Sequence, residues 1–210
     1  MDLVEHRSNI LVIENNNEFE KFVLRLYEQL ESDVDFFYTD EEKRTLFNKM
    51  IMICSPFDLQ ISEREIQKKL YIHLTNEIES SSLGERLREA YSYIVQSLEE
   101  LDVYNDFELD YEEEFSTNCI LKNFNVKLKK FEGVFCQRLI AYADVMHKLL
   151  AKDYIVLCNC DAYFNPEDYD YLEQWANYNE ITILFLRNTQ LIWPKECNEY
   201  IIDSDLCELH

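Results

Sequence analysis

Residues 153–186, DYIVLCNCDAYFNPEDYDYLEQWANYNEITILFL, contain the pattern that decides the fold class. Residues 154–158 are a short apolar run typical of a buried strand. Pro166 opens a predicted helix over 166–176, because proline is favoured in the first turn of a helix. A second apolar strand follows over 181–186. The order strand, helix, strand predicts an α/β fold.

The two ends of the chain share this α/β character. Residues 10–13 and 50–54 are apolar runs of strand length, and residues 200–202 are a last short strand. Between the first two strands, residues 18–30 place apolar side chains on one helical face, and Asn17 can cap that helix. Both ends of the chain are therefore expected to build one α/β unit.

The middle of the chain has a helical pattern instead. Ser62 and Glu65 form the capping box of a first helix, and the apolar residues from Leu87 to Leu101 recur with a near-heptad rhythm. Three further elements are expected in this region: helices over 112–123 and 131–152, and a short strand over 126–129.

These patterns predict a discontinuous head domain over 1–61 and 151–210, with an α-helical leg domain over 62–150 inserted into it. A chain of 210 residues, 47% of them hydrophobic, is long enough to bury such a core. Its two glycines, Gly84 and Gly133, stand far apart. A loop that cradles phosphates needs several neighbouring glycines, so we expect no functional P-loop in the head.

Cysteine usage and hydropathy indicate a cytoplasmic protein. The seven cysteines are an odd set without paired spacing, which favours reduced thiols over a disulfide framework. No apolar run reaches the ~18 residues of a membrane span, and no signal peptide opens the chain. We therefore expect the protein to work in the cytoplasm, with no membrane as a partner.

Charge changes sign abruptly in the middle of the chain. Residues 99–114 carry nine acidic residues and no basic one. If this run is helical, some of its carboxylates lie one turn apart, and each such pair destabilises the helix by ~0.2–0.5 kcal/mol. The pairs are Asp106 with Asp110, and Glu108 with Glu112. A calcium ion, which accepts several carboxylate oxygens, would remove this repulsion. On spacing alone, a solvated acidic face is the simpler interpretation.

The next stretch, residues 115–152, is basic in a chain whose net charge is −22. Four of its lysines are close together in the sequence: Lys122, Lys127, Lys129 and Lys130. In the expected strand, Lys127 and Lys129 point to one side, where they can contact the phosphates of a nucleic acid. Pairing of these lysines with the neighbouring acids explains the sequence equally well. A smaller basic cluster precedes the second strand and consists of Lys43, Arg44 and Lys49.

Few residues suggest catalysis. The four histidines lack zinc-binding spacing, and Cys158-Asn159-Cys160 has no histidine nearby to activate a thiolate. A buried strand end is the simpler interpretation of these cysteines. Asp58 and Asp161 follow predicted strands and are the carboxylates from which a metal-dependent nuclease could be built. Acidic residues are common in loops after strands, so these two do not by themselves indicate a nuclease.

Eight segments follow one another along the chain in a distinctive order. They are ILVIEN (10–15), ICSPFDLQIS (53–62), KLYIHL (69–74), FELDYEE (107–113), LKNFNVKL (121–128), DYIVLCNCDAYF (153–164), ITILFL (181–186) and YIIDSDLC (200–207). Their order and spacing resemble the Csn2 family of CRISPR-associated type II-A adaptation proteins. The resemblance extends over nearly the whole chain.

This resemblance implies a P-loop-like α/β head without a functional P-loop, an α-helical leg, and no enzymatic activity. It implies a homotetrameric ring whose central channel takes up double-stranded DNA from a free end, without reading its sequence. Calcium is implied as the cofactor that holds the ring. The CRISPR integrase and the effector nuclease are the implied partners in spacer acquisition, a step of antiviral defence.

The resemblance also implies two sets of site residues. Calcium ligands are expected among Asp106, Glu108, Asp110, Glu112 and Glu113. DNA-binding residues are expected at Lys43, Arg44, Lys49, Lys122, Lys127, Lys129 and Lys130. Two other functions stay open on the sequence: an acidic protein-interaction module or DNA mimic, which would bind basic partners, and the metal-dependent nuclease.

Overall fold

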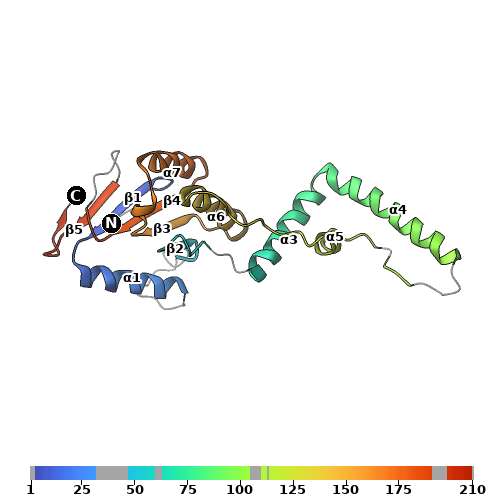
Figure 1. Ribbon diagram of the computed structural model, residues 1–210, viewed down its shortest axis with the longest axis horizontal. Helices are drawn as coiled ribbons and strands as arrows, with labels where there is room; N and C mark the ends of the chain where they lie inside the picture. The colour runs from blue at the N-terminus through green and yellow to red at the C-terminus, as the bar shows by residue number, and fades with distance from the viewer. Residues whose placement is uncertain are drawn as a thin grey trace. The chain divides into compact units, whose positions relative to one another are not determined.

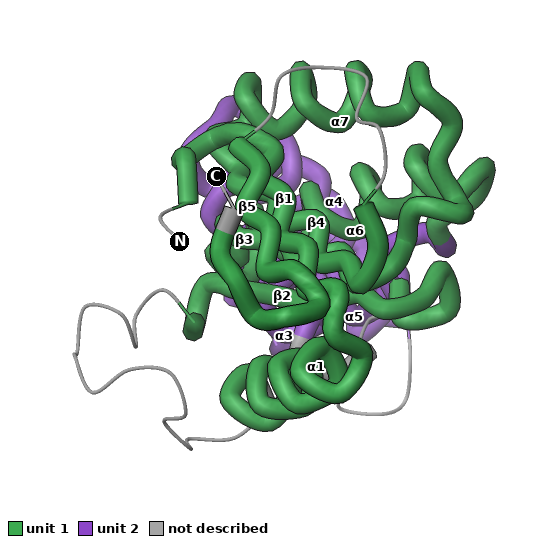
Figure 2. Tube along the Cα trace, turned by 90° about the vertical axis from the view of Figure 1, so that its left-hand side faces the viewer, with its two compact units in different colours: residues 1–60, 131–210 green, residues 61–130 purple. Residues whose placement is uncertain are grey.

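The chain divides into two compact units, and the computed structural model describes most of each. The described residues are 3–31, 47–59, 63–104, 110–112, 114–190 and 198–209. Unit 1 comprises residues 1–60 and 131–210, and unit 2 comprises residues 61–130 (Figure 2). Unit 1 combines a sheet with helices, whereas the described elements of unit 2 are all helices.

A parallel sheet lies at the centre of unit 1. Its strands in the described part of the chain are β1 (Ser8–Ile13), β2 (Met50–Ile53), β3 (Tyr154–Cys158), β4 (Thr182–Arg187), β5 (Asn198–Ile202) and β6 (Glu208–Leu209). They lie in the order β2-β3-β4-β1-β5-β6, and only β6 is antiparallel to its neighbour. The predicted α/β fold class is confirmed.

Helices cover both faces of this sheet (Figures 1 and 2). On one face lies α1 (Asn16–Glu31), whose Leu26 packs into a cluster with Leu11 and Leu186. On the other face lie α6 (Phe135–Leu150) and α7 (Pro166–Tyr178). Because both faces are covered, the central strands β1, β3 and β4 are almost entirely buried and mostly apolar.

Helix α6 belongs to unit 1, although the sequence analysis assigned its residues to the leg over 62–150. Its Phe135 ring packs against Phe164, with 5.1 Å between the ring centroids. Its Arg138 donates a hydrogen bond of 2.8 Å from Nη2 to the carbonyl oxygen of Pro56. These partners all lie in unit 1, so the division falls after residue 130 instead of 150. Periodicity identified the helix but could not say which surface its apolar face covers.

Unit 2 contains three described helices: α3 (Glu63–Glu79), α4 (Ser82–Tyr104) and α5 (Thr117–Asn123). Helices α3 and α5 are in contact, and the buried residues of its small core include Ile66 and Leu70 of α3 and Leu121 of α5. Gly84 in the first turn of α4 is buried, and a Cβ atom there would lie 2.9 Å from the carbonyl oxygen of Ile78. Glycine therefore permits the tight passage from α3 to α4. The expected capping residue Ser62 lies outside the described residues.

Besides α6, which begins at Phe135 and not at 131, two helix starts differ from the sequence analysis. The first is α1, which is capped by Asn15 and not by Asn17: the Asn15 Oδ1 accepts the backbone N–H of Asn17 at 3.1 Å and of Glu18 at 3.3 Å. The second is α5, which begins at Thr117 and not at 112. The Ser116 hydroxyl accepts the N–H of Cys119 at 3.3 Å, which sets that start.

The expected strand over 126–129 is not a strand. A reversal of the chain places this segment after α5: Asn125 has a left-handed φ of 48°, and the Val126 N–H donates to the Leu121 carbonyl oxygen at 3.0 Å. No neighbouring strand pairs with it among the described residues. The alternation of side chains nevertheless holds, because Val126 and Leu128 are half-buried while Lys127 and Lys129 are exposed.

Candidate nucleic-acid interface

Residues 115–130, here named the lysine segment, contain four lysines and no acidic residue. Two hydrogen bonds attach this segment to α3: the Gln67 side-chain amide donates to the Val126 carbonyl oxygen at 2.5 Å, and the Tyr71 hydroxyl donates to that of Leu121 at 3.4 Å. The buried Leu121 side chain adds an apolar anchor. The lysine segment is therefore held in place by its backbone and its apolar residues, and its charged groups are not needed for that purpose.

The four lysines of this segment are all exposed: Lys122, Lys127, Lys129 and Lys130. None of them forms an ion pair with any residue that the structure describes. Pairing with neighbouring acids, which the sequence left open, is therefore not found within the described ranges. The four ammonium groups are available to an anionic ligand.

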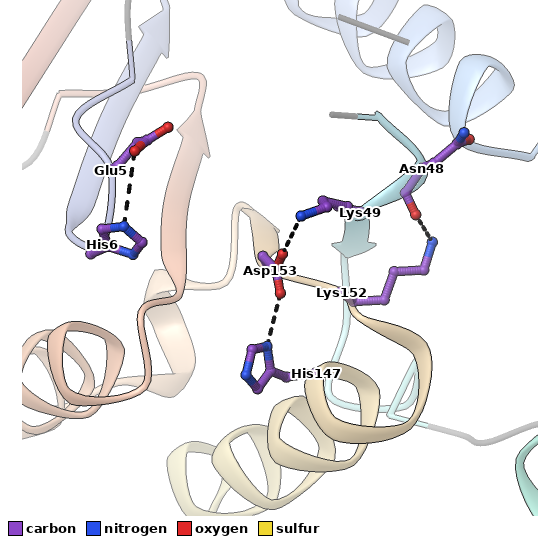
Figure 3. Close-up of polar contacts among 7 residues, drawn as sticks. All are labelled: Glu5, His6, Asn48, Lys49, His147, Lys152 and Asp153. Carbon is purple, nitrogen blue, oxygen red and sulfur yellow. Dashed lines mark hydrogen bonds and ion pairs between the residues drawn. The ribbon is translucent and has the colours of Figure 1, made fainter. Parts of the chain in front are cut away.

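Lys49, which directly precedes β2 in unit 1, differs from these four lysines because it has an acidic partner (Figure 3). Its Nζ lies 2.9 Å from one carboxylate oxygen of Asp153, and Nδ1 of His147 lies 2.9 Å from the other. The hydrogen bond and negative charge of Asp153 raise the pKa of Lys49 above its ordinary value. The Lys49 carbonyl oxygen accepts the backbone N–H groups of Asp153 and Tyr154. Lys49 is thus already neutralised within the fold.

A second lysine of unit 1, Lys152, also has local partners. Its Nζ donates to the carbonyl oxygen of Asn48 at 2.6 Å (Figure 3) and to that of Met50 at 3.3 Å. Of the basic cluster predicted before β2, Lys43 and Arg44 lie outside the described residues. Lys49 therefore differs from the lysine segment. Its positive charge is compensated by Asp153, whereas no described residue forms an ion pair with a lysine of the segment.

Of the expected calcium ligands, Asp110 and Glu112 are described, and both are exposed. Residues 110–112 are not helical, so the helical spacing considered for this run does not apply to these two. The Tyr91 hydroxyl of α4 donates to the Glu112 carbonyl oxygen at 2.7 Å, which attaches the backbone of Glu112 to that helix. Asp106, Glu108 and Glu113 lie outside the described residues. Within the described ranges, no cluster of three potential metal ligands occurs.

The connection from β1 to α1 bears on nucleotide binding. It consists of Glu14 and Asn15 alone, and neither is a glycine. The Glu14 carboxylate accepts the side-chain amide of Gln190 at 2.9 Å and the backbone N–H of Ser204 at 3.2 Å. In P-loop proteins a longer, glycine-rich loop at such a strand–helix junction cradles the phosphates. This junction instead places a carboxylate there.

The two carboxylates considered for a nuclease have structural partners. Asp161 accepts an ion-paired hydrogen bond from Arg187 and a second from the Tyr169 hydroxyl at 3.2 Å. Asp58 accepts the backbone N–H of Cys54 at 2.9 Å. Sequence analysis missed Arg187, which is only 1% exposed at the end of β4. In the sequence, Arg187 directly follows the apolar run over residues 181–186. A charged residue at such a position could have indicated a buried ion pair, because a buried guanidinium requires an acidic partner.

None of the described helices combines the length and the apolar character that crossing a membrane requires.

Comparisons with known proteins agree on one family. The family model described as CRISPR-associated protein (Cas_Csn2) matches residues 27–206. The CRISPR-associated protein Csn2 of Streptococcus agalactiae is 22% identical over 210 residues, which cover 97% of this chain and 90% of that protein. The crystal structure of Stu0660 of Streptococcus thermophilus is similar with a TM-score of 0.56 at 13% identity, covering 99% of this chain and 72% of that one. This structural likeness concerns the fold.

Proposed function

The chain belongs to the Csn2 family of CRISPR-associated proteins, and from this premise we propose that it binds double-stranded DNA during spacer acquisition. The observation that carries the proposal is the lysine segment. Its four lysines are exposed, and none is in an ion pair with a described residue. Lysines of this kind bind phosphates without reading bases, so the DNA sequence does not matter.

We further propose calcium as the cofactor of this binding. The chain carries a net charge of −22, so long-range repulsion opposes the approach of DNA. Asp110 and Glu112 present exposed carboxylates, and carboxylate oxygens are the donors that calcium prefers. Together with Asp106, Glu108 and Glu113 they would hold the calcium ion, and the bound ion would neutralise part of the negative charge of unit 2. The lysines nearby in sequence would then bind DNA phosphates with less repulsion of the DNA by the neighbouring carboxylates.

The proposed assembly is a homotetrameric ring that DNA enters from a free end. Each lysine contact in such a ring is weak, but several contacts inside a closed channel retain the duplex, because it can leave only by sliding to an end. The proposed location is the cytoplasm, where the CRISPR integrase and effector nuclease would be the partners. Family membership is what supports these three points.

We propose no catalytic step. The junction between β1 and α1 carries Glu14 where a phosphate-binding loop would need glycines, so nucleotide hydrolysis has no support there. Asp161 is paired with the buried Arg187, which leaves it poorly placed to collect a catalytic metal ion. The protein would act by holding DNA.

One comparison tests the proposal against its rivals. Linear and closed circular duplexes of equal length are mixed with the protein, with calcium or with a chelator, at two salt concentrations. We expect retention of the linear duplex only, in calcium only, decreasing steeply with salt. Absence of binding under every condition would favour the acidic module or DNA mimic. Shortened DNA products would favour the nuclease.

A further inference from the structure

Three cysteines meet at the carboxyl ends of the neighbouring strands β2 and β3. Cys54 directly follows β2, Cys158 is the last residue of β3, and Cys160 lies two residues beyond. About one hundred residues separate Cys54 from Cys158 in the sequence, so no motif announces the cluster. The strand order places them side by side, because β2 and β3 are parallel neighbours.

The side chains of Cys54 and Cys158 lie on the same face of the sheet. Ile53, the last residue of β2, is paired with Leu157, so continuing this register by one residue places Cys54, the first residue after β2, opposite Cys158 of β3. Met52 and Cys158 both pack in the cluster under α1, and Cys54 follows Met52 by two positions. Adjacent strands are ~4.8 Å apart, within the ~4.4–6.8 Å between Cα atoms that a disulfide spans.

The two thiols differ in access and in acidity. Cys54 is exposed and Cys158 is 5% exposed. The interaction between the two thiols lowers the pKa of Cys54 and, together with burial, raises the pKa of Cys158. The more acidic sulfur is thus the one that a dissolved oxidant can reach, which is what a reactive cysteine requires.

Cys160 has a separate structural role. Its sulfur lies 3.4 Å from the carbonyl oxygens of both Ile53 and Cys158. Its side chain is buried, and burial raises the pKa of its thiol to about 12. It therefore remains a protonated thiol that bridges the two strand ends.

We propose that Cys54 and Cys158 form a peroxide-sensitive dithiol that oxidises to an intramolecular disulfide. The Cys54 thiol first releases its proton to solvent, and the resulting thiolate attacks one oxygen of hydrogen peroxide. The O–O bond breaks, Cys54 becomes a sulfenic acid, and the departing hydroxide takes up the released proton and leaves as water. The Cys158 sulfur then attacks the Cys54 sulfur, the S–O bond breaks, and the Cys158 proton leaves with the hydroxide as a second water. Two thiols are oxidised and one peroxide is reduced.

This disulfide would secure an edge of the sheet. β2 is the outermost strand on its side, and β3 is its one partner in the described sheet. The bond would also close a loop over residues 55–157, which contains the whole of unit 2. A cross-link that closes so long a loop restricts the unfolded chain strongly, so oxidation raises the thermal unfolding temperature.

The test is mass spectrometry of the full-length protein after treatment with hydrogen peroxide, with peptide mapping without reduction. We expect the loss of two hydrogen atoms, one peptide pair joined through Cys54 and Cys158, and reversal by dithiothreitol. The unfolding temperature should rise on oxidation and return on reduction. A disulfide to Cys160, or Cys54 oxidised to sulfinic acid with Cys158 still reduced, would overturn the proposal.

Matched variants separate the pair from general oxidation. Cys54→Ser should abolish both the disulfide and the rise in unfolding temperature, and its exposed position makes it a mild change. Cys119→Ser, at another exposed cysteine, should leave both unchanged. In Cys158→Ala, Cys54 should progress to sulfinic acid, with a gain of two oxygen atoms. Should that variant not fold, mapping of the wild-type protein still decides the question. A disulfide that persists in Cys54→Ser would exclude the assigned pair.

Discussion

Basic residues of unit 1 and the lysine segment of unit 2 use positive charge differently. In unit 1, Lys49 lies 2.9 Å from a carboxylate oxygen of Asp153, and the buried Arg187 is paired with Asp161. In unit 2, no lysine of the segment is in an ion pair with a described residue. The family resemblance implies the same DNA-binding function for Lys49 and for the lysines of the segment. The difference teaches that basic residues expected at the same kind of site can differ in whether the fold already supplies an acidic partner, as it does for Lys49.

The strongest test of this comparison removes a charge that the fold uses. Arg187→Met leaves Asp161, whose side chain is 15% exposed, without its cation. Breaking a buried pair in this way lowers the free energy of unfolding by about 3–5 kcal/mol. Urea denaturation measures the loss. Arg25→Met, at an exposed position of α1, is the matched control and should change stability little. Equal losses in the two variants would mean that Arg187 is not a structural cation.

The second test reverses charges that the fold does not use. Lys127→Glu combined with Lys129→Glu should weaken duplex binding more than about tenfold and lower the slope of log K against log salt by about 2. The fold should be retained, since both side chains are exposed. Binding is measured by fluorescence anisotropy in calcium, and folding by circular dichroism.

The matched control for this variant makes the same charge change in unit 1, by Lys21→Glu combined with Lys49→Glu. Both lysines have acidic partners, Glu18 and Asp153. We expect a much smaller loss of binding from this control. If both double variants weaken binding equally, net charge alone governs the affinity and the two regions do not differ.

A third test concerns calcium and the acidic residues of unit 2. Asp110→Asn combined with Glu112→Gln should reduce the ratio of DNA affinities in calcium and in chelator several-fold, because two oxygen donors become weaker ligands. Calorimetric titration with calcium should show weaker binding to the same variant. Glu85→Gln combined with Glu89→Gln, on exposed positions of α4, changes the net charge equally and should preserve the response. A normal calcium response in the first variant would exclude Asp110 and Glu112 as ligands.

The smallest expected effect is that of Lys49→Gln on stability. Its pKa is raised above the ordinary value of 10.5 in the folded protein, mainly by the hydrogen bond to Asp153. The stabilisation is therefore complete below that value and is lost as pH rises through the higher folded pKa. The unfolding temperature of the variant should lie slightly below that of the wild type at neutral pH, and the gap should close in alkali. A gap that widens above pH 10.5 would contradict the pairing.

Local patterns predicted most elements of the head well. The strand predicted over 154–158 is β3 without any shift, and the helix predicted from Pro166 is α7. The strand could be predicted because a strand that is buried on both faces of a sheet is apolar throughout. The helix could be predicted because proline is favoured in the first turn of a helix. Residues 126–129 were misread, since an alternating pattern also fits an extended segment that packs on one side without a strand partner.

The candidate site was predictable only in part, for a related reason. The concentration of lysines in residues 115–130 can be read directly from the sequence, and so the lysine segment could be predicted as a candidate site. The ion pair of Lys49 joins residues 104 positions apart. Arg187, the last residue of β4, pairs with Asp161, which lies just beyond the end of the neighbouring strand β3. No local pattern encodes such distances.

The sequence by itself determined the α/β class, the helical insertion, the family-like order of segments and the concentration of lysines in residues 115–130. Only the tertiary structure decided that α6 packs in unit 1, that Cys54 meets Cys158, and which basic residues are neutralised. The physical reason is the distance in sequence over which each kind of interaction acts. Periodicity and charge act between residues close in sequence, whereas hydrogen bonds, ion pairs and thiol contacts depend on which strands the fold makes neighbours.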